Sequence, residues 1–123
     1  MTRPSSLYHE APFVEKVRAI ILANLANENF GVASLAREFS LSRAQLFRKI
    51  RAHTGRSIAA FIQEVRVGQV KYLLGATSLT IAEIAWQTGY SEPSSLRRAF
   101  YQQTGQKPSH YRRANGKQKQ SLG

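Results

Sequence analysis

The sequence predicts an all-α fold of seven helices, and three observations lead to this expectation. Apolar residues recur at three- and four-residue spacing along most of the chain, which is the pattern of amphipathic helices. No stretch of four or more residues alternates apolar and polar side chains as a half-buried strand does. Capping residues, glycines and prolines fall where the helices should begin and end.

The N-terminal half of the chain carries the first four predicted helices. Between Phe13 and Ala26 the apolar side chains share one face and predict the first helix. The polar segment before Ala11 is expected to be irregular, with Pro4 and Pro12 as helix breakers. The other three are predicted at about residues 32–40, 43–53 and 57–74.

Turn chemistry supports these boundaries and those of the last three helices. Ser42 with Gln45, and Thr80 with Glu83, have the spacing of capping boxes, which open helices. Gly55 is expected to close the third helix in a left-handed conformation. The remaining helices are predicted at about residues 81–87, 93–103 and 109–113.

Two stretches of the chain repeat each other, 49–50 residues apart. VASLAREFSLSRAQLFRKI begins at Val32, and IAEIAWQTGYSEPSSLRRAF begins at Ile81. Each predicts a short helix, a tight turn and a second helix rich in arginine, which is the layout of a DNA-binding helix-turn-helix. The second helix of each copy is called its reading helix below.

The charge of the chain favours a polyanionic partner. Among 123 residues, 18 are basic and 7 are acidic, for a net charge of +11. All the acidic residues are glutamates, and there is no cysteine, which excludes disulfides, thiolate catalysis and zinc-finger ligation. No signal peptide or spanning segment is recognisable, so we expect a soluble cytoplasmic protein with no membrane association.

The reading helices place arginines on their outward faces. Leu46 and Ile50 should face the core in the first, and Leu96 and Phe100 in the second. An arginine in the major groove can hold guanine O6 and N7 with two hydrogen bonds, worth about 1–3 kcal/mol of discrimination between bases. Arg48 and Arg98, which share a Leu-x-Arg spacing, are therefore the preferred specificity residues. A solvated charged face is the alternative interpretation.

Other positions are expected to bind phosphates, which fixes the register without reading sequence. They comprise the helix starts near Val32, Thr80 and Ile81 and the basic residues Lys49, Arg51, Arg56, Lys107, Arg112 and Arg113. The hydroxyl of Thr80 could instead only cap its own helix.

Two other classes of function were considered. A basic helical scaffold could bind RNA or a ribosomal surface through charge alone, without sequence preference. An enzyme is not expected, because aspartate and cysteine are absent and the three histidines lie far apart. No cofactor and no metal site are expected. Trp86 is expected to have a core or packing role and not to stack on a base, and Tyr90 and Tyr111 are expected in the core.

The repeated pattern resembles the DNA-binding domain of the AraC/XylS family of bacterial transcription regulators. The resemblance covers about Phe13 to Arg113, and its most specific part is IAEIAWQTGYSEPSSLRRAFYQQTGQKPSHYR. It implies two helix-turn-helix units bridged by a long helix, bound as a monomer to consecutive major grooves, and RNA polymerase as a partner. It places base reading on Arg43, Ala44, Phe47, Arg48, Ser94, Ser95, Arg97 and Arg98.

This sequence departs from the family pattern at Leu96, where many members have an aromatic residue, and at Val70, where alanine is more common. The runs FGVASLA and LSRAQLFRKIRAHTG resemble the output domains of hybrid two-component sensors. A missing sensor or kinase domain in a larger parent protein is thus one possibility, and a stand-alone short activator is the other.

The resulting domain organisation has five parts. They are a flexible N-terminal tail (1–11), a first helix-turn-helix subdomain (12–56), a linker helix (57–75), a second helix-turn-helix subdomain (76–114) and a flexible basic C-terminal tail (115–123).

Overall fold

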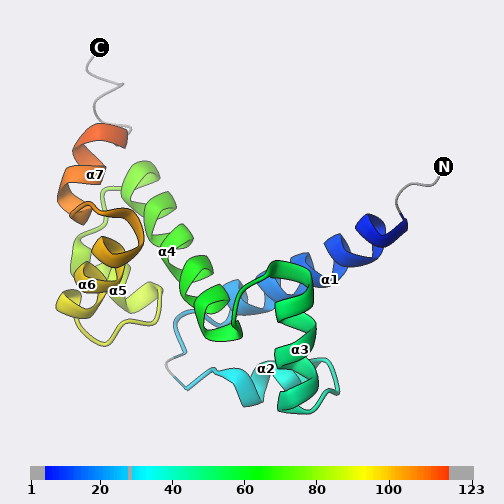
Figure 1. Ribbon diagram of the computed structural model, residues 1–123. Helices are drawn as coiled ribbons and strands as arrows, with labels where there is room; N and C mark the ends of the chain where they lie inside the picture. The colour runs from blue at the N-terminus through cyan, green and yellow to red at the C-terminus, as the bar shows by residue number, and fades with distance from the viewer. Residues whose placement is uncertain (1–4, 28, 117–123) are drawn as a thin grey trace. The chain divides into compact units, whose positions relative to one another are not determined.

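The computed structural model describes residues 5–27 and 29–116, with side chains from Pro12 onward. These residues form seven helices and no strand, so the all-α prediction is confirmed for the described part of the chain. The helices are α1 (Ser5–Ala23), α2 (Val32–Glu38), α3 (Arg43–Thr54), α4 (Ile58–Ala76), α5 (Ile81–Gln87), α6 (Pro93–Thr104) and α7 (Pro108–Asn115) (Figure 1).

The helices belong to two compact units. The first unit contains the chain up to Asn24 and residues 29–62, and thus α1, α2, α3 and the start of α4. The second unit contains Leu25 to Glu28 and the chain from Gln63, and thus the rest of α4 with α5, α6 and α7.

The first unit has a core built from three helices that contact one another. Val17 and Ile21 of α1, Leu35 of α2 and Leu46 and Ile50 of α3 are each at most 1% exposed. Burying a side chain of this size contributes about 1.5–3 kcal/mol. The predicted inward face of the first reading helix is therefore confirmed.

The core of the second unit forms between the C-terminal part of α4 and the helices that follow. Leu96 and Phe100 of α6 pack with Ile84 of α5 and with apolar side chains of α4. Tyr111 of α7 packs edge-on against Phe100, with ring centroids 5.5 Å apart. Tyr90 and Tyr111 are only partly buried, at the margin of this core.

Both predicted capping boxes are present. The Gln45 amide donates to Ser42 Oγ at 3.1 Å, and the Ser42 amide donates to Gln45 Oε1 at 2.8 Å. Thr80 and Glu83 exchange the same pair of bonds at 3.1 and 2.8 Å. These bonds satisfy amides that an α-helix leaves unpaired in its first turn, so α3 and α5 begin where the sequence predicts.

The two reading helices, α3 and α6, also end in the same way. The Thr54 hydroxyl donates to the Ile50 carbonyl at 2.8 Å, and the Thr104 hydroxyl donates to the Phe100 carbonyl at 2.8 Å. Gly55 and Gly105 follow, each with φ of 74°, a left-handed conformation that glycine adopts without the cost of a Cβ. We call this arrangement the Thr-Gly stop.

Three expected helix ends were wrong, and one of them is the C-terminal end of α1, which lies at Ala23 and not at Ala26. α1 begins at Ser5 and contains Pro12, because an internal proline removes one hydrogen bond and can kink a helix without ending it. α4 continues through Gly75 to Ala76. The expected C-terminal tail lies beyond Gly116 for the most part, outside the described residues.

The end of α4 is stabilised by a side chain distant in sequence. Arg112 donates from Nε to the Leu74 carbonyl and from Nη2 to the Thr77 carbonyl, both at 3.1 Å. The last carbonyls of a helix have no partner within it. Because Arg112 supplies donors there, the helix extends past the glycine that was expected to end it.

Candidate nucleic-acid interface

The outward face of α3 carries the four residues predicted to read bases in the first unit. Since Leu46 and Ile50 are buried, the opposite side of the helix faces solvent. Arg43, Ala44, Phe47 and Arg48 are all exposed there, with Phe47 at 44%. An exposed aromatic ring among arginines is an apolar contact surface within a cationic face.

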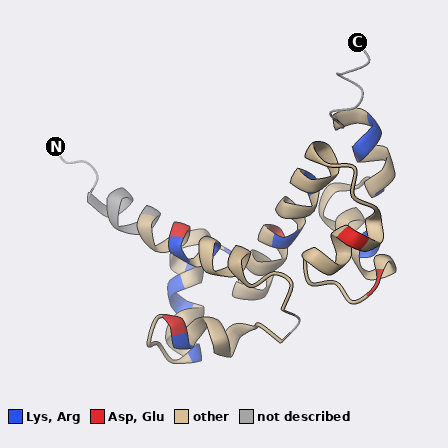
Figure 2. Ribbon diagram, turned by 180° about the vertical axis from the view of Figure 1, so that it is seen from behind, with Lys and Arg blue, Asp and Glu red and all other residues tan. Residues whose placement is uncertain are grey.

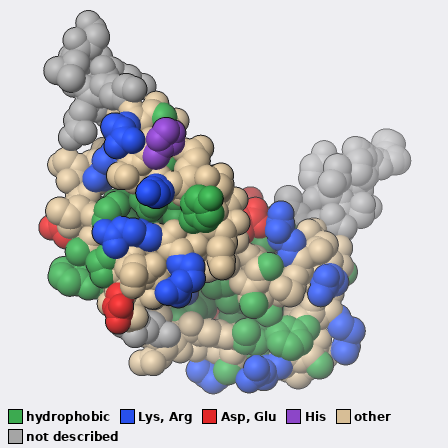
Figure 3. Space-filling view, turned by 60° about the vertical axis from the view of Figure 1, so that its left-hand side comes forward, with side chains coloured by type: hydrophobic (Ala, Val, Ile, Leu, Met, Phe, Trp, Pro, Cys, Tyr) green, Lys and Arg blue, Asp and Glu red, His purple; other side chains and the backbone are tan. Residues whose placement is uncertain are grey.

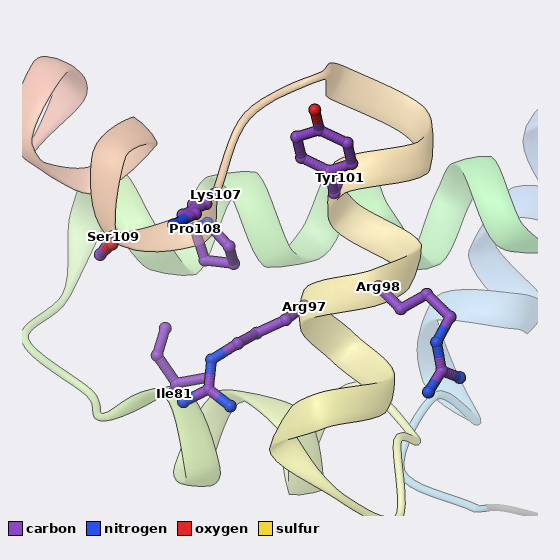
Figure 4. Close-up of a pocket in the computed structure, with 7 residues that line it drawn as sticks. All are labelled: Ile81, Arg97, Arg98, Tyr101, Lys107, Pro108 and Ser109. Carbon is purple, nitrogen blue, oxygen red and sulfur yellow. The ribbon is translucent and has the colours of Figure 1, made fainter.

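The outward face of α6 is similar in its exposure but different in composition. Ser94, Arg97 and Arg98 are exposed, and Ser95 is half-buried. Figure 4 shows that the two arginines diverge, with Arg97 reaching toward Ile81 and Arg98 extending on the other side of the helix. The guanidinium groups of Arg97 and Arg98 therefore lie in different surroundings, although the two residues are adjacent on one helix.

The residues predicted to bind phosphate differ in their availability. Lys49, Arg51, Arg56, Thr80, Lys107 and Arg113 are exposed, while Val32, Ile81 and Arg112 are half-buried. The guanidinium of Arg112 is bonded to the end of α4, and the Thr80 hydroxyl accepts the Glu83 amide. The bonds of Arg112 were not foreseen from the sequence, whereas the bond of Thr80 is the helix cap that was considered as the alternative to a phosphate contact.

The turn between α5 and α6 is held by an arginine that sequence reasoning missed. Arg66 of α4 donates from Nη1 to the Thr88 carbonyl and, at 3.1 Å, to the Leu25 carbonyl. Its guanidinium also lies 5.7 Å from the centroid of the Tyr90 ring. The available signal was an arginine next to Val65 and Val67 in an apolar stripe, since buried arginine is rarely found without partners.

Burial shifts the pKa of both members of this contact. Removal from water lowers the pKa of Arg66 below its ordinary value, and the neighbouring Tyr90 opposes that change. Removal from water raises the pKa of Tyr90 to about 12, and the charge of Arg66 opposes that change. The hydroxyl of Tyr90 lies 3.2 Å from Gln63 Oε1 and donates to it, so the neutral phenol is the form that the fold binds.

Trp86 was expected to have a core or packing role, and a place in the core was wrong. Its side chain is 63% exposed on α5, while its neighbours Ile84 and Ala85 are fully buried. Ile84 and Ala85 leave no inward position for the next residue, because a helix turns 100° per residue. Trp86 therefore belongs to the surface of the second unit.

The two histidines whose side chains are described belong to different units. His53 lies at the end of α3 and packs against Phe13, with ring centroids 5.1 Å apart, and His110 is exposed on α7. The side chain of His9 is outside the described part. Within that part no group of three metal-ligating residues occurs, and no helix is long and apolar enough to span a bilayer.

Charge on the helices is predominantly positive. Figure 2 shows lysines and arginines recurring along the helices of each unit, with few acidic residues. In the face seen in Figure 3, each unit presents basic side chains interspersed with hydrophobic ones. Such a surface suits an anionic partner that also offers apolar area, as nucleic acids do.

In each unit a short helix is followed by a tight turn and then by an exposed helix that carries basic side chains. This arrangement occurs twice and defines a double helix-turn-helix protein. The family model of a helix-turn-helix domain matches residues 35–114. The chain belongs to this family, in its AraC/XylS type of transcription regulators.

Curated relatives support this membership. The chain is 33% identical over 89 residues to the arabinose operon regulatory protein of Escherichia coli, covering 72% of this chain and 30% of that protein. It is 34% identical over 98 residues to histidine kinase P4 of Formosa agariphila, covering 80% of this chain and 7% of that protein. The chain thus spans a minor part of these relatives.

Solved structures agree with the fold. The DNA-binding domain of AdpA, in complex with a target DNA, has a TM-score of 0.73 and 33% identity, with 82% of this chain and 90% of that chain covered. The C-terminal domain of AraT, a response regulator from Geobacillus stearothermophilus, has a TM-score of 0.76 and 28% identity, with 85% and 87% covered.

Proposed function

We propose that this chain is a sequence-specific duplex DNA-binding module of a transcription regulator, with α3 and α6 entering consecutive major grooves. The observation that carries the proposal is the repeated unit. In each copy a leucine and an apolar residue four positions later are buried, so that the opposite, arginine-bearing face of the helix is exposed. Successive major grooves on one side of the duplex lie about 34 Å apart, so a site on the order of 20 bp would suffice without dimerisation.

Arg48 and Arg98 are the proposed specificity residues. They occupy equivalent positions, two residues after the buried Leu46 and Leu96, and both are exposed. Guanidinium groups at such positions can make paired hydrogen bonds to guanine. The smaller Ala44 and Ser94 can contribute only a methyl contact or a single hydrogen bond.

The relatives support a role in transcription. AdpA is described as a global transcriptional factor bound to target DNA, and the arabinose protein is described as an operon regulator. We propose RNA polymerase as a partner of this chain. A sensor or kinase domain is a further proposed partner, in line with the histidine kinase and response regulator among the similar proteins.

Selection from a random duplex pool, followed by affinity measurements, tests the DNA-binding proposal. The selected duplex should bind more tightly than a scrambled one of the same composition. Arg48→Ala and Arg98→Ala should each reduce this preference by about 5-fold to 150-fold, corresponding to about 1–3 kcal/mol per lost base contact. Arg113→Ala, on the exposed surface of α7, should weaken both duplexes equally.

Two results would contradict the proposal. A wild-type protein that binds selected duplex, scrambled duplex and structured RNA alike would be a charge-driven scaffold. Equal losses on both duplexes for Arg48→Ala and Arg98→Ala would remove these residues from base reading.

A further inference from the structure

A hollow of about 620 Å³ lies beside the reading helix of the second unit (Figure 4). Its walls come from Arg97, Arg98 and Tyr101 of α6, from Ile81 at the start of α5, and from residues 107–109, where α7 begins. Lys107 adds a third cation to the two arginines, and none of the lining residues is acidic.

The first unit contains a hollow of its own, of about 330 Å³. Its walls come from Phe47 and Arg51 of α3 and from Ser57, Ile58 and Ala59, where α4 begins. This hollow also has no acidic lining residue.

The two hollows are the same feature of the duplicated unit. Adding 50 to the numbers of the five residues in the first hollow gives 97, 101, 107, 108 and 109, all of which line the second. The equivalence follows from the backbone, because the Thr-Gly stop ends both reading helices identically and so places the start of the next helix in the same way.

The aromatic residue and the arginine that line each hollow occupy exchanged positions in the two reading helices. The first hollow has an aromatic residue at 47 and an arginine at 51, whereas the second has an arginine at 97 and an aromatic residue at 101. Positions four apart lie on the same face of a helix, one turn from each other. Each hollow therefore combines one aromatic ring with one guanidinium at the same two positions of its reading helix.

We infer that each hollow binds one backbone phosphate of the DNA, beside the groove that its reading helix enters. A guanidinium can hold two phosphate oxygens at once. The aromatic ring and the apolar residue at the start of the next helix, Ile58 or Pro108, form walls suited to the deoxyribose. This inference rests on the proposed function and deepens it.

The inference separates the roles of two neighbouring arginines. Arg97 reaches along the hollow toward Ile81 and is assigned to a phosphate, not to a base (Figure 4). Arg98 borders the hollow but extends its guanidinium to the other side of α6, where it remains available to a base. In the first unit the equivalent phosphate residue is Arg51, and Phe47 is a wall instead of a base contact.

An exchange experiment within the second hollow tests this directly. Three variants are compared with the wild type: Arg97→Tyr, Tyr101→Arg, and the double variant that adopts the arrangement of the first hollow. Arg97→Tyr should weaken binding to selected and scrambled duplexes by the same factor and reduce the salt dependence by about one phosphate contact. The double variant should recover both the affinity and the salt dependence of the wild type. Lys71→Ala, an exposed residue of α4 that lines neither hollow, controls for loss of one charge.

A measurement without DNA separates this inference from the proposed function. Inorganic pyrophosphate is titrated into the wild-type protein while the backbone amide signals of Ala59 and Ser109 are followed by NMR. Both signals should shift saturably, Ser109 at lower concentration because its hollow has more cations. The Ser109 shift should be lost in Arg97→Tyr and restored in the double variant.

The outcomes are distinct. A wild type without sequence preference, but with the expected pyrophosphate shifts and exchange behaviour, would overturn the proposed function and support the phosphate site. Loss of sequence preference in Arg97→Tyr without equal loss on scrambled duplex, or no recovery in the double variant, would overturn the phosphate assignment. If the exchange is not tolerated by the fold, the same comparison with Phe47→Arg and Arg51→Phe in the first unit decides the question.

Discussion

The guanidinium of Arg66 occupies the space that any side chain at Gly89 would need. A Cβ built at Gly89 would collide with Arg66 Nη1 and with the Leu25 carbonyl that Arg66 binds. Gly89 also has φ of 88°, a backbone conformation that is unfavourable for residues with a Cβ. The turn before the second reading helix is thus defined by a glycine and an arginine together.

Replacing this glycine should destabilise the protein. Gly89→Ala places a Cβ in an unfavourable φ and in a collision, and we expect the free energy of unfolding to fall by about 1–3 kcal/mol or more. Gly68→Ala is the matched control, because Gly68 lies inside α4 with no atom within 4 Å of its built Cβ. There alanine should stabilise by about 0.5–1 kcal/mol. Denaturant unfolding midpoints measure both, and a neutral Gly89→Ala would contradict the role of the turn.

Stability should decrease in alkali because of Tyr90. Burial raises its pKa to about 12, so the folded state favours the neutral phenol more than the unfolded state does. The contribution of the neutral Tyr90 phenol to the free energy of unfolding is complete below the ordinary tyrosine pKa of about 10. It is lost as the pH rises from there through the pKa of the folded state.

Urea unfolding of the wild type and Tyr90→Phe between pH 8 and 11 checks this. Other groups titrate in both proteins, so the difference between them isolates Tyr90. The wild type should lose its advantage over the variant as pH rises, and parallel curves would show that Tyr90 ionises as in the unfolded chain.

Thr80 should act mainly as a helix cap. Thr80→Ala removes the acceptor of the Glu83 amide and should cost about 1 kcal/mol of stability, whereas Thr80→Ser keeps the hydroxyl and should behave like the wild type. Thermal unfolding measures the loss. If Thr80→Ala leaves stability unchanged but weakens DNA binding, the hydroxyl contacts phosphate and is not a cap in function.

Neighbouring arginines on α7 should separate stability from binding. Arg112→Ala removes two partly buried hydrogen bonds to carbonyls at the end of α4 and should cost about 1–3 kcal/mol, because these carbonyls lose their donors. Arg113→Ala, which is exposed, should leave the unfolding free energy within about 0.5 kcal/mol of the wild type. Equal destabilisation of the two variants would contradict the assignment.

Local features of the fold were predictable from the sequence. The capping boxes at Ser42 and Thr80, the left-handed Gly55 and the inward Leu46 depend on neighbours within one or two helical turns. Such interactions are encoded in residue type and spacing, and the repeat supported Leu46 and Gly55 a second time through Leu96 and Gly105. The all-α fold followed from the same kind of local signal, whereas the family followed from the resemblance of the repeated motif.

Features that depend on distant residues were not predictable. Trp86 was expected to have a core or packing role, but Ile84 and Ala85 already occupy the buried positions of α5. The partners of Arg66 and Arg112 are backbone carbonyls 22 to 41 residues away, and sequence spacing gives no sign of them. The proposed phosphate sites likewise needed coordinates, since the arginine at position 51 has its counterpart at 97 and not at 101.

The identical Thr-Gly stops have a consequence for how such a protein diverges. Their hydrogen bonds involve a threonine hydroxyl and main-chain atoms only, so the end of each reading helix does not depend on which side chains its outward face carries. If α3 and α6 read bases as proposed, we expect point substitutions on their outward faces to change sequence preference one half-site at a time, while the other half-site and the fold of both units stay unchanged.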